Sequence, residues 1–286
     1  MNDLTYAQKH DTNFVVNNHL NRQYAIVYDE SYLAENPSCC IIPVKNRREV
    51  ELLLLSLGEA ASVVMDEQAR KLCDVWDLYG RTYSNVFNDL KWSYREEKEV
   101  LDIIEKIPLP KINSDSFRTN NFDTPEPERI DQEYVHKNNK DNVLISIPAK
   151  YGNMFYFSGF KESPEFNLDH CSDHLEGVII FELVRQAVMA SVHLAGLPLS
   201  GTIVILETTI HYKKFIEYSQ PYLIRTIPVI RQRGGLGFDV YNIIQNDQTC
   251  ITGYFTGIVY KSKESYQKFR NIKLIGRTSN ENESSL

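Results

Sequence analysis

The sequence feature that most constrains the fold of this chain is a long apolar run that extends from Leu175 to Leu194. Its length and its content of good helix formers predict a helix. Apolar side chains occupy every face of that helix and not one stripe alone. They are Val178, Ile179, Ile180, Phe181, Leu183, Val184, Ala187, Val188, Met189, Ala190, Val192, Leu194 and Ala195. A helix that is apolar all round belongs inside a domain, so we expect other elements to wrap around it.

Four strand-like runs follow the helix, as judged from their β-branched and aromatic content. They are Thr202 to Tyr212, Tyr222 to Arg231, Leu236 to Gln245, and Thr249 to Val259. Arg233-Gly234-Gly235 and Asn246-Asp247 supply turn residues, and connections this short suit only antiparallel pairing. Two more strand candidates, Val143 to Ile147 and Met154 to Phe157, precede the helix. One long helix followed by an antiparallel meander fits the hotdog fold, an α+β architecture in which a curved sheet wraps a central helix.

The first part of the chain has a different character, and we expect it to be mainly helical. Helix-like stretches run from Glu49 to Ala69, from Leu72 to Tyr79 and from Tyr94 to Ile107. Short strand-like runs at Tyr24 to Tyr28 and Cys39 to Val44 precede them. A degenerate first hotdog is the alternative interpretation of this region.

Changes in composition divide the chain into four parts. Pro108 and Pro110 end the helical region, and the following stretch is rich in Asn, Ser, Asp, Thr, Pro and Glu. We therefore predict an N-terminal region over residues 1–110, a linker over 111–133, a hotdog domain over 134–262 and a polar tail over 263–286. Thr278 to Leu286 is expected to be disordered.

Charge and hydropathy exclude several classes of protein. The chain of 286 residues has 31 Lys and Arg against 38 Asp and Glu, a net charge of -7, which argues against a nucleic-acid partner. No uninterrupted apolar run reaches the roughly 18 residues that span a bilayer, and the opening residues lack a signal-peptide pattern. We expect a cytoplasmic protein with no membrane partner. Five scattered cysteines show no metal-binding spacing, so we expect them to be reduced and structural.

Three polar residues interrupt the apolar helix. Glu182, Arg185 and Gln186 follow the spacing i, i+3 and i+4, which brings them together on one helical face. Ionisable groups are rarely buried without partners. One interpretation is an internal ion pair that fixes the rotation of the helix, since such pairs need not stabilise a fold. The other is a functional site.

Two Asp-His pairs stand just before the helix and favour the functional interpretation. They are Asp169-His170 and Asp173-His174, and Gly177 follows them. A helix N-terminus favours anionic ligand groups such as phosphate or an oxyanion. Histidines beside a carboxylate can also exchange protons near neutral pH. A metal site lacks a third clear ligand, so we predict neither a metal nor another cofactor.

These residues carry a resemblance to a known family. The segment D-H-x-x-D-H, the glycine and the helix motif E-x-x-R-Q, which spans Glu182 to Gln186, resemble the signature of the A-factor biosynthesis hotdog family. The opening Val135-His136-Lys137 and the run after Asn142 are similar to a second mark of the same family. The resemblance covers roughly residues 134–260. It implies a protein of signal or secondary-metabolite biosynthesis.

The resemblance implies transfer of a β-ketoacyl group from an acyl carrier protein to the hydroxyl of a small phosphorylated compound, on the way to a butyrolactone or butenolide. Glu182 would then be the general base, and Arg185 would hold the phosphate or orient Glu182. His174 is the third expected catalytic residue. The expected substrate-binding residues are Asp169, His170, Asp173, Gly177 and Gln186.

The chain also departs from this family. Residues 1–110 show no second copy of the motifs, and Glu176 stands where a proline commonly precedes the glycine. Two alternatives therefore stay open: a non-catalytic acyl-binding or regulatory protein, and a thioesterase or dehydratase acting on acyl carrier protein or coenzyme A thioesters. A single hotdog sheet leaves an edge exposed, so we expect a homodimer.

Overall fold

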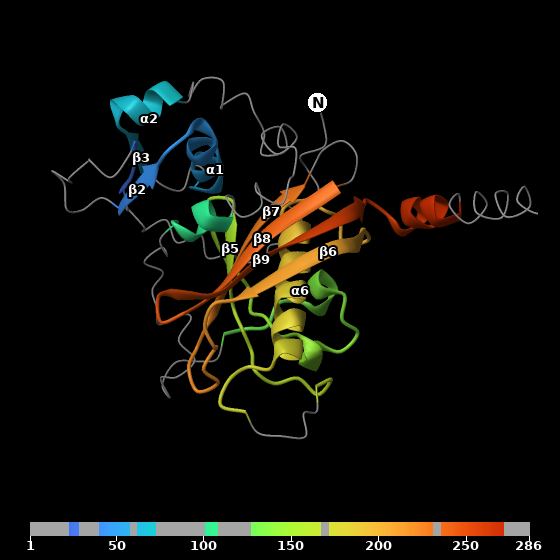
Figure 1. The fold of residues 1–286 in the computed structure, drawn as a ribbon. Helices are drawn as coiled ribbons and strands as arrows, with labels where there is room; N and C mark the ends of the chain where they lie inside the picture. Colours follow the sequence, from blue (N-terminus) through green and yellow to red (C-terminus); the bar gives the residue numbers. More distant parts are fainter. Residues whose placement is uncertain are drawn as a thin grey trace, which may run out of the picture.

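The computed structural model of the protein describes residues 23–28, 40–57, 62–72, 101–107, 127–166, 172–230 and 236–271. Its largest part is a six-stranded antiparallel sheet with a long helix, α6 (Gly177–Leu194), against one face (Figure 1). The strands are β4 (Ala149–Tyr151), β5 (Met154–Ser158), β6 (Thr202–Tyr212), β7 (Leu223–Ile230), β8 (Leu236–Gln245) and β9 (Gln248–Tyr260).

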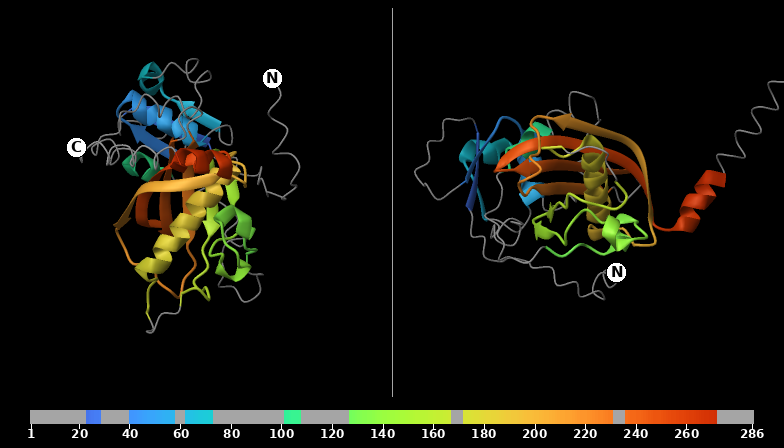
Figure 2. Two further views of the ribbon diagram at one scale, coloured as in Figure 1. Left: turned by 90° about the vertical axis from the view of Figure 1, so that its right-hand side faces the viewer. Right: turned by 90° about the horizontal axis from the view of Figure 1, so that it is seen from below.

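The sheet order is β4-β5-β7-β8-β9-β6. The strand that follows α6, β6, therefore lies at the opposite edge of the sheet from β4 and β5, and among the described strands it pairs with β9 alone. Figure 2 shows the sheet curving around α6. The predicted hotdog fold is confirmed.

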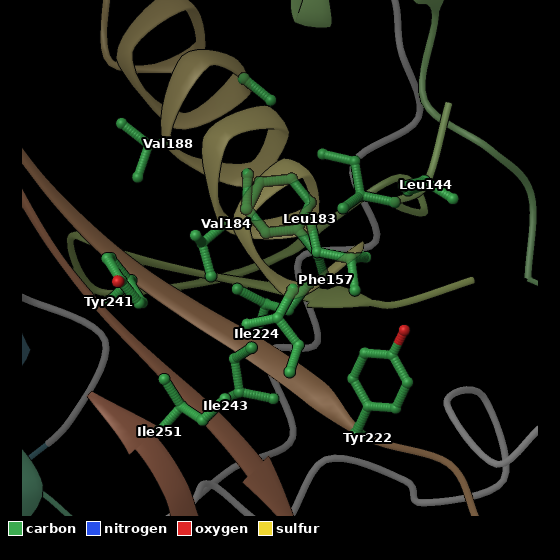
Figure 3. Packing of buried hydrophobic residues seen from close by; sticks show 14 of the residues in the cluster. Leu144, Phe157, Leu183, Val184, Val188, Tyr222, Ile224, Tyr241, Ile243 and Ile251 are labelled. Carbon is green, nitrogen blue, oxygen red and sulfur yellow. The ribbon is translucent and has the colours of Figure 1, made fainter. Parts of the chain in front are cut away.

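The inner face of the sheet and α6 share one apolar core. Alternate strand residues such as Ile224 on β7, Tyr241 and Ile243 on β8 and Ile251 on β9 point toward Leu183 on the helix (Figure 3). Burial of an aliphatic side chain of this kind contributes about 1.5–3 kcal/mol. Burial of many such side chains therefore fixes α6 in the curve of the sheet.

One face of α6 is not covered, which differs from the expectation of a helix wrapped on all sides. Val178 is 48% exposed and Phe181 is 38% exposed. The neighbouring edge strand β6 also exposes apolar side chains, and Leu206 is 58% exposed. Within the described ranges, α6 is the one helix long and apolar enough to cross a membrane, but 72% of it is buried in the fold, as in the core helix of a soluble domain.

The outer face of the sheet packs against an N-terminal unit. Tyr156, Val240 and Tyr254 belong to a second core that also contains Tyr24 and Leu53. Because neighbouring strand residues point to opposite faces, these side chains lie on the side of the sheet away from α6. The sheet is thus covered on both faces.

A buried arginine joins the N-terminal unit to the sheet. Arg225 on β7 is 1% exposed and donates to the carbonyls of Ile104 (2.9 Å) and Ile107 (2.7 Å) and to Asn242 Oδ1 (2.7 and 3.0 Å). The two carbonyls lie at the C-terminal end of a helix whose described residues are 101–105, where helix carbonyls lack internal partners. Arg225 therefore caps that helix from the sheet.

The N-terminal unit alternates strands and helices. It contains β1 (Gln23–Tyr28), β2 (Cys40–Val44), α1 (Arg47–Leu57), β3 (Ser62–Met65) and α2 (Glu67–Leu72). The three strands are parallel in the order β2-β1-β3. A hotdog sheet is antiparallel, so the described part of this unit does not have the topology of a degenerate hotdog.

The prediction of one helix from Glu49 to Ala69 is wrong. The strand β3 interrupts it and pairs with β1 between Gln23 and Ile26. Val63 and Val64 are β-branched, and pairing with a buried neighbouring strand outweighs the helix propensity around them. The expected helices over residues 73–79 and 94–100 lie outside the described residues.

Smaller elements also differ from the prediction. The run from Val143 to Ile147 forms only isolated bridges, and the short helices η3 (Gln132–Val135) and η4 (Lys140–Asn142) precede it. A helix over residues 263–271 occupies the start of the predicted polar tail. The residues from Thr278 onward lie outside the described part of the chain.

Candidate functional site

Glu182 on α6 is the centre of a cluster of hydrogen bonds. Its side chain accepts from Arg185 at both oxygens, with 2.7 Å from Nε to Oε2 and 2.7 Å from Nη2 to Oε1. Gln186 Nε2 donates to Oε1 at 2.9 Å, and Lys137 Nζ lies 3.0 Å from the same oxygen. Glu182 itself is 8% exposed. The predicted meeting of these three helix residues on one face is confirmed.

The partners of Glu182 determine its ionisation. Burial alone would raise the pKa of Glu182, but the hydrogen bonds from Arg185, Gln186 and Lys137 and the charge of Arg185 outweigh burial. Together they lower the pKa from 4.5 to about 2. Glu182 is therefore an ionised carboxylate at neutral pH and a weak proton acceptor.

Gln186 ties the same face of α6 to the segment that precedes β4. Its Nε2 also lies 2.9 Å from the carbonyl of Asn142, and its Oε1 accepts from the backbone N–H of Leu144 at 2.7 Å. Gln186 is fully buried. Its amide thus satisfies a backbone donor and a backbone acceptor that α6 would otherwise leave buried without partners.

The turn after η3 contacts α6 through three consecutive residues. The carbonyl of Val135 accepts from Arg185 Nη2 at 3.4 Å, and Lys137 reaches Glu182 as described. Between them, His136 Nε2 lies 2.9 Å from His193 Nε2 near the end of the helix. The two sequence marks of the family resemblance, about 45 residues apart, therefore form one contact network in the fold.

The tautomers of the two histidines follow from their contacts. His193 Nδ1 lies 3.1 Å from the carbonyl of Leu197, which can only accept, so Nδ1 carries the proton. His193 Nε2 then accepts from His136. Burial lowers the pKa of both histidines. The repulsion that would arise if both rings were protonated lowers the pKa of His136 further, so the neutral form of the pair is favoured.

A cavity of about 320 Å³ lies at the N-terminus of α6. His174 and Gly177 contribute to one side of it, and Lys213 and Lys214 contribute to the other. The Lys213 ammonium forms an ion pair with Glu105 at 2.5 Å, and the Lys214 ammonium donates to the neutral Gln248 side chain, so the charge of Lys214 is the one that no carboxylate balances among the contacts of these two lysines. The remaining lining is mostly apolar: Leu175, Ile180, Tyr212, Phe215 and Ile216. A cavity with apolar walls, a histidine and one lysine without a carboxylate partner can hold a ligand that has both an acyl chain and an anionic group.

His174 is oriented by the residue before it. Its Nδ1 lies 2.7 Å from Asp173 Oδ1, and this hydrogen bond holds the pKa of the Asp173 carboxyl below its usual range. With Nδ1 donating to the carboxylate, Nε2 is the nitrogen that can accept a proton. A Cβ at Gly177 would make only an ordinary contact with the Tyr212 hydroxyl, at 3.4 Å, so the space at the start of α6 does not require a glycine.

The structure thus divides the predicted site residues into two groups. Glu182, Arg185 and Gln186 form the cluster on the helix, whereas Asp173, His174 and Gly177 lie at the helix N-terminus. The cavity that His174 lines does not include Glu182. Asp169, His170 and Cys171 lie outside the described residues. In the described ranges, no three His, Cys, Asp or Glu side chains are grouped so as to hold a metal ion.

Sequence reasoning missed three lysines of the site. Lys137 belongs to the family mark that was recognised, but nothing in the spacing links it to Glu182. Lys213 and Lys214 follow β6, and the turn that brings them back to the start of α6 has no sequence signal of its own. Only the three-dimensional structure reveals these contacts.

A second buried carboxyl contacts α6 from the sheet. Asp239 on β8 is 1% exposed; its Oδ2 makes a short hydrogen bond with Ser191 Oγ, and its Oδ1 accepts from the N–H of Ile227 at 3.2 Å. Ser191 Oγ also lies 2.8 Å from the carbonyl of Val188. Burial raises the pKa of Asp239 well above its usual range, so this carboxyl keeps its proton.

A comparison with known families supplies the assignment. The family model of the A-factor biosynthesis hotdog domain matches residues 118–261. The chain belongs to this family. The matched residues include the Glu182 cluster, the histidine pair and the cavity at the start of α6. The match begins within the stretch predicted as a linker. Membership places the AfsA-type domain in a hotdog family related to acyl-thioester chemistry.

The comparison with solved structures finds matches of low sequence identity to this AfsA-type chain. It is similar to the uncharacterized protein PH1136 from Pyrococcus horikoshii, with 14% identity, 47% of this chain and 95% of that chain covered, and a TM-score of 0.34. It is also similar to a hypothetical thioesterase with coenzyme A from Streptococcus pneumoniae, with 18% identity, coverage of 37% and 78%, and a TM-score of 0.30. No curated protein matches the chain.

Proposed function

We propose that this protein transfers a β-ketoacyl group from an acyl carrier protein to the hydroxyl of a small phosphorylated compound. The observation that supports this best is the cavity at the N-terminus of α6. It combines apolar walls for an acyl chain, the Lys214 ammonium for an anionic group and a histidine held by a carboxylate. The AfsA-type sequence motifs border the same helix.

In the proposed reaction the hydroxyl oxygen attacks the thioester carbonyl. A carbon–oxygen bond forms and the carbon–sulfur bond breaks, so that an ester and a free thiol result. His174 Nε2 takes the proton from the hydroxyl and returns it to the departing sulfur. The backbone N–H groups at the start of α6 stabilise the oxyanion of the tetrahedral intermediate. The step requires no other reactant.

This mechanism gives Glu182 a different role from the one the family resemblance implies. A carboxylate with a pKa of about 2, already contacted by Arg185, Gln186 and Lys137, is a poor base for a hydroxyl. We assign proton transfer to His174. Glu182 would instead hold Arg185 in place, with the guanidinium directed along the partly exposed face of α6.

A second copy of the chain would complete the site. The start of α6 exposes Val178 and Phe181, and the edge strand β6, which pairs with β9 alone among the described strands, exposes Ile205 and Leu206. Apolar side chains on a free strand edge favour association with another strand. A two-fold pairing of β6 edges would cover this surface in both copies and enclose the acyl group.

Turnover of β-ketoacyl carrier protein with and without dihydroxyacetone phosphate tests the proposed function. We expect a phosphate-ester product that depends on the acceptor. Release of free acid would indicate a thioesterase, an enoyl product would indicate a dehydratase, and tight acyl binding without turnover would indicate a binding protein.

Two variants separate the roles of the histidine and the glutamate. We expect His174→Asn to reduce the transfer rate at least 100-fold, the typical contribution of a positioned acid–base group being about 10²–10⁴. The control is His211→Asn, because His211 is an exposed histidine on β6 outside the cavity lining. Equal rates for His174→Asn and the wild type would exclude His174 as the proton acceptor.

A further inference from the structure

Lys137 lies in the loop after η3, and its side chain contacts the Glu182 carboxylate from outside α6. Its Nζ lies 3.0 Å from Glu182 Oε1 and also contacts Glu165. The Lys137 side chain is only 12% exposed, although lysine usually extends into solvent. A lysine held in this way by two carboxylates has lost much of its side-chain freedom, which requires a compensating interaction.

We propose that Lys137 is a positioning residue of the site: it holds the Glu182 carboxylate in the orientation in which that carboxylate fixes Arg185. This inference rests on the proposed function for its catalytic consequence. The contact itself is independent of that function.

The backbone of the turn places Lys137 for this task. His136 has a left-handed conformation with φ of 55°, and the Lys137 N–H donates to the carbonyl of Gln132 at 3.0 Å, which reverses the chain after η3. The His136 side chain is anchored on His193 at 2.9 Å. Because the residues on either side of the turn are fixed, the lysine side chain is directed at the helix.

The charges around Glu182 balance only when Lys137 is included. Arg185 and Gln186 face Glu182 from α6, Lys137 faces it from the turn, and Glu165 lies beyond Lys137. Two cations and two carboxylates then sum to zero. Without Lys137 the cluster would carry one net negative charge, and Glu182 would hold Arg185 with one fewer donor on the shared oxygen.

The orientation of the Glu182 carboxylate matters because the Arg185 guanidinium binds it through two hydrogen bonds. Arg185 donates to both oxygens of Glu182, so a rotation of the carboxylate would break one of the two bonds. Lys137 and Gln186 both contact Oε1 and prevent that rotation. A change at Lys137 should therefore affect the guanidinium although Lys137 does not touch it.

The experiment compares Lys137→Met and Lys137→Arg in the full chain. The control is Lys140→Met, which removes the same charge from an exposed lysine three residues further along. Glutamate labelled with ¹³C at the carboxyl, with the Glu182 signal assigned from Glu182→Gln, reports the ionisation of Glu182 directly. Turnover of the β-ketoacyl thioester reports the catalytic consequence.

We expect the Glu182 carboxyl to stay ionised down to about pH 3 in the wild type, in Lys137→Arg and in Lys140→Met. In Lys137→Met the same carboxyl should begin to protonate about one pH unit higher, because a nearby opposite charge has been lost. The transfer rate of Lys137→Met should fall about tenfold or more with little change in the KM of the acceptor, and Lys137→Arg should restore most of it. If Lys137→Met does not fold, Lys137→Gln provides the same comparison, because its amide can donate without a charge.

Identical titration of Glu182 in Lys137→Met and the wild type would overturn the proposal. So would a Lys137→Arg variant as slow as Lys137→Met. If the wild type shows no transfer at all, the proposed function fails, but the carboxyl titration still decides whether Lys137 positions Glu182.

Discussion

The buried carboxyl of Asp239 should make the protein less stable as the pH rises, and Asp239→Asn should remove that effect. A protonated Asp239 donates to Ser191 Oγ, Ser191 donates to the carbonyl of Val188, and Asp239 Oδ1 accepts from Ile227. Asparagine can reproduce every one of these bonds, because its Nδ2 donates and its Oδ1 accepts. The variant therefore keeps the contacts and loses only the ionisable proton.

Proton linkage determines the direction and the size of this change in stability with pH. Burial raises the folded-state pKa of the Asp239 carboxyl well above its ordinary value of 3.8. Its contribution to stability is fully present below pH 3.8 and is lost as the pH rises toward the folded-state pKa, since the unfolded chain releases the proton first. Within that window the free energy of unfolding of the wild type should fall, relative to Asp239→Asn, by about 1.4 kcal/mol for each pH unit.

Urea denaturation at pH 5, 6, 7 and 8 measures this difference. The control is Asp247→Asn, because Asp247 is exposed in the β8–β9 turn and has a φ of 58° that asparagine tolerates. We expect Asp239→Asn to gain on the wild type as the pH rises from 5, and Asp247→Asn to follow the wild type. A wild type that is more stable than Asp239→Asn by the same amount at every pH would refute the reasoning, because it would mean that Asp239 is ionised in the folded protein.

Two further predictions concern contacts on the outside of the hotdog core. Arg225→Met should lower the free energy of unfolding by about 3 kcal/mol or more, because it leaves three buried acceptors without a donor, at about 1–3 kcal/mol each. Urea denaturation measures this loss, with Arg270→Met on the exposed C-terminal helix as the control. A loss below about 1 kcal/mol would contradict the capping role of Arg225. Leu206→Asp on the β6 edge should shift the protein from dimer to monomer in analytical ultracentrifugation, while Lys268→Asp should not; a wild type that sediments as a monomer would exclude the proposed pairing.

The elements of the hotdog half could be predicted closely because each has a strong local pattern. The helix was expected over Leu175 to Leu194 and begins at Gly177, and the strand expected over Thr202 to Tyr212 has those bounds in the structure. The turn at Asn246 and Asp247 is formed by two residues with positive φ, as the sequence indicates. These features depend on residues that are neighbours in the chain.

The features that were missed depend on residues far apart. The parallel pairing of β1 with β3 could not be predicted from either strand, and the same holds for the contact of Lys137 with Glu182. The exposed side of α6 was also unexpected, because an apolar sequence cannot distinguish a face that is buried in the same chain from one that another molecule covers. The roles of the individual site residues stay predictions.

The cap that Arg225 places on a helix of the N-terminal unit has a practical consequence for anyone who isolates the hotdog half. A fragment cut at residue 118, where the family match begins, would remove both carbonyls that receive the guanidinium and would open Tyr156, Val240 and Tyr254 to water. The border of sequence similarity is therefore not a border of cooperative folding. Expression trials should retain the whole chain from β1 onward, and homologous domains that stand alone must cover this surface in another way.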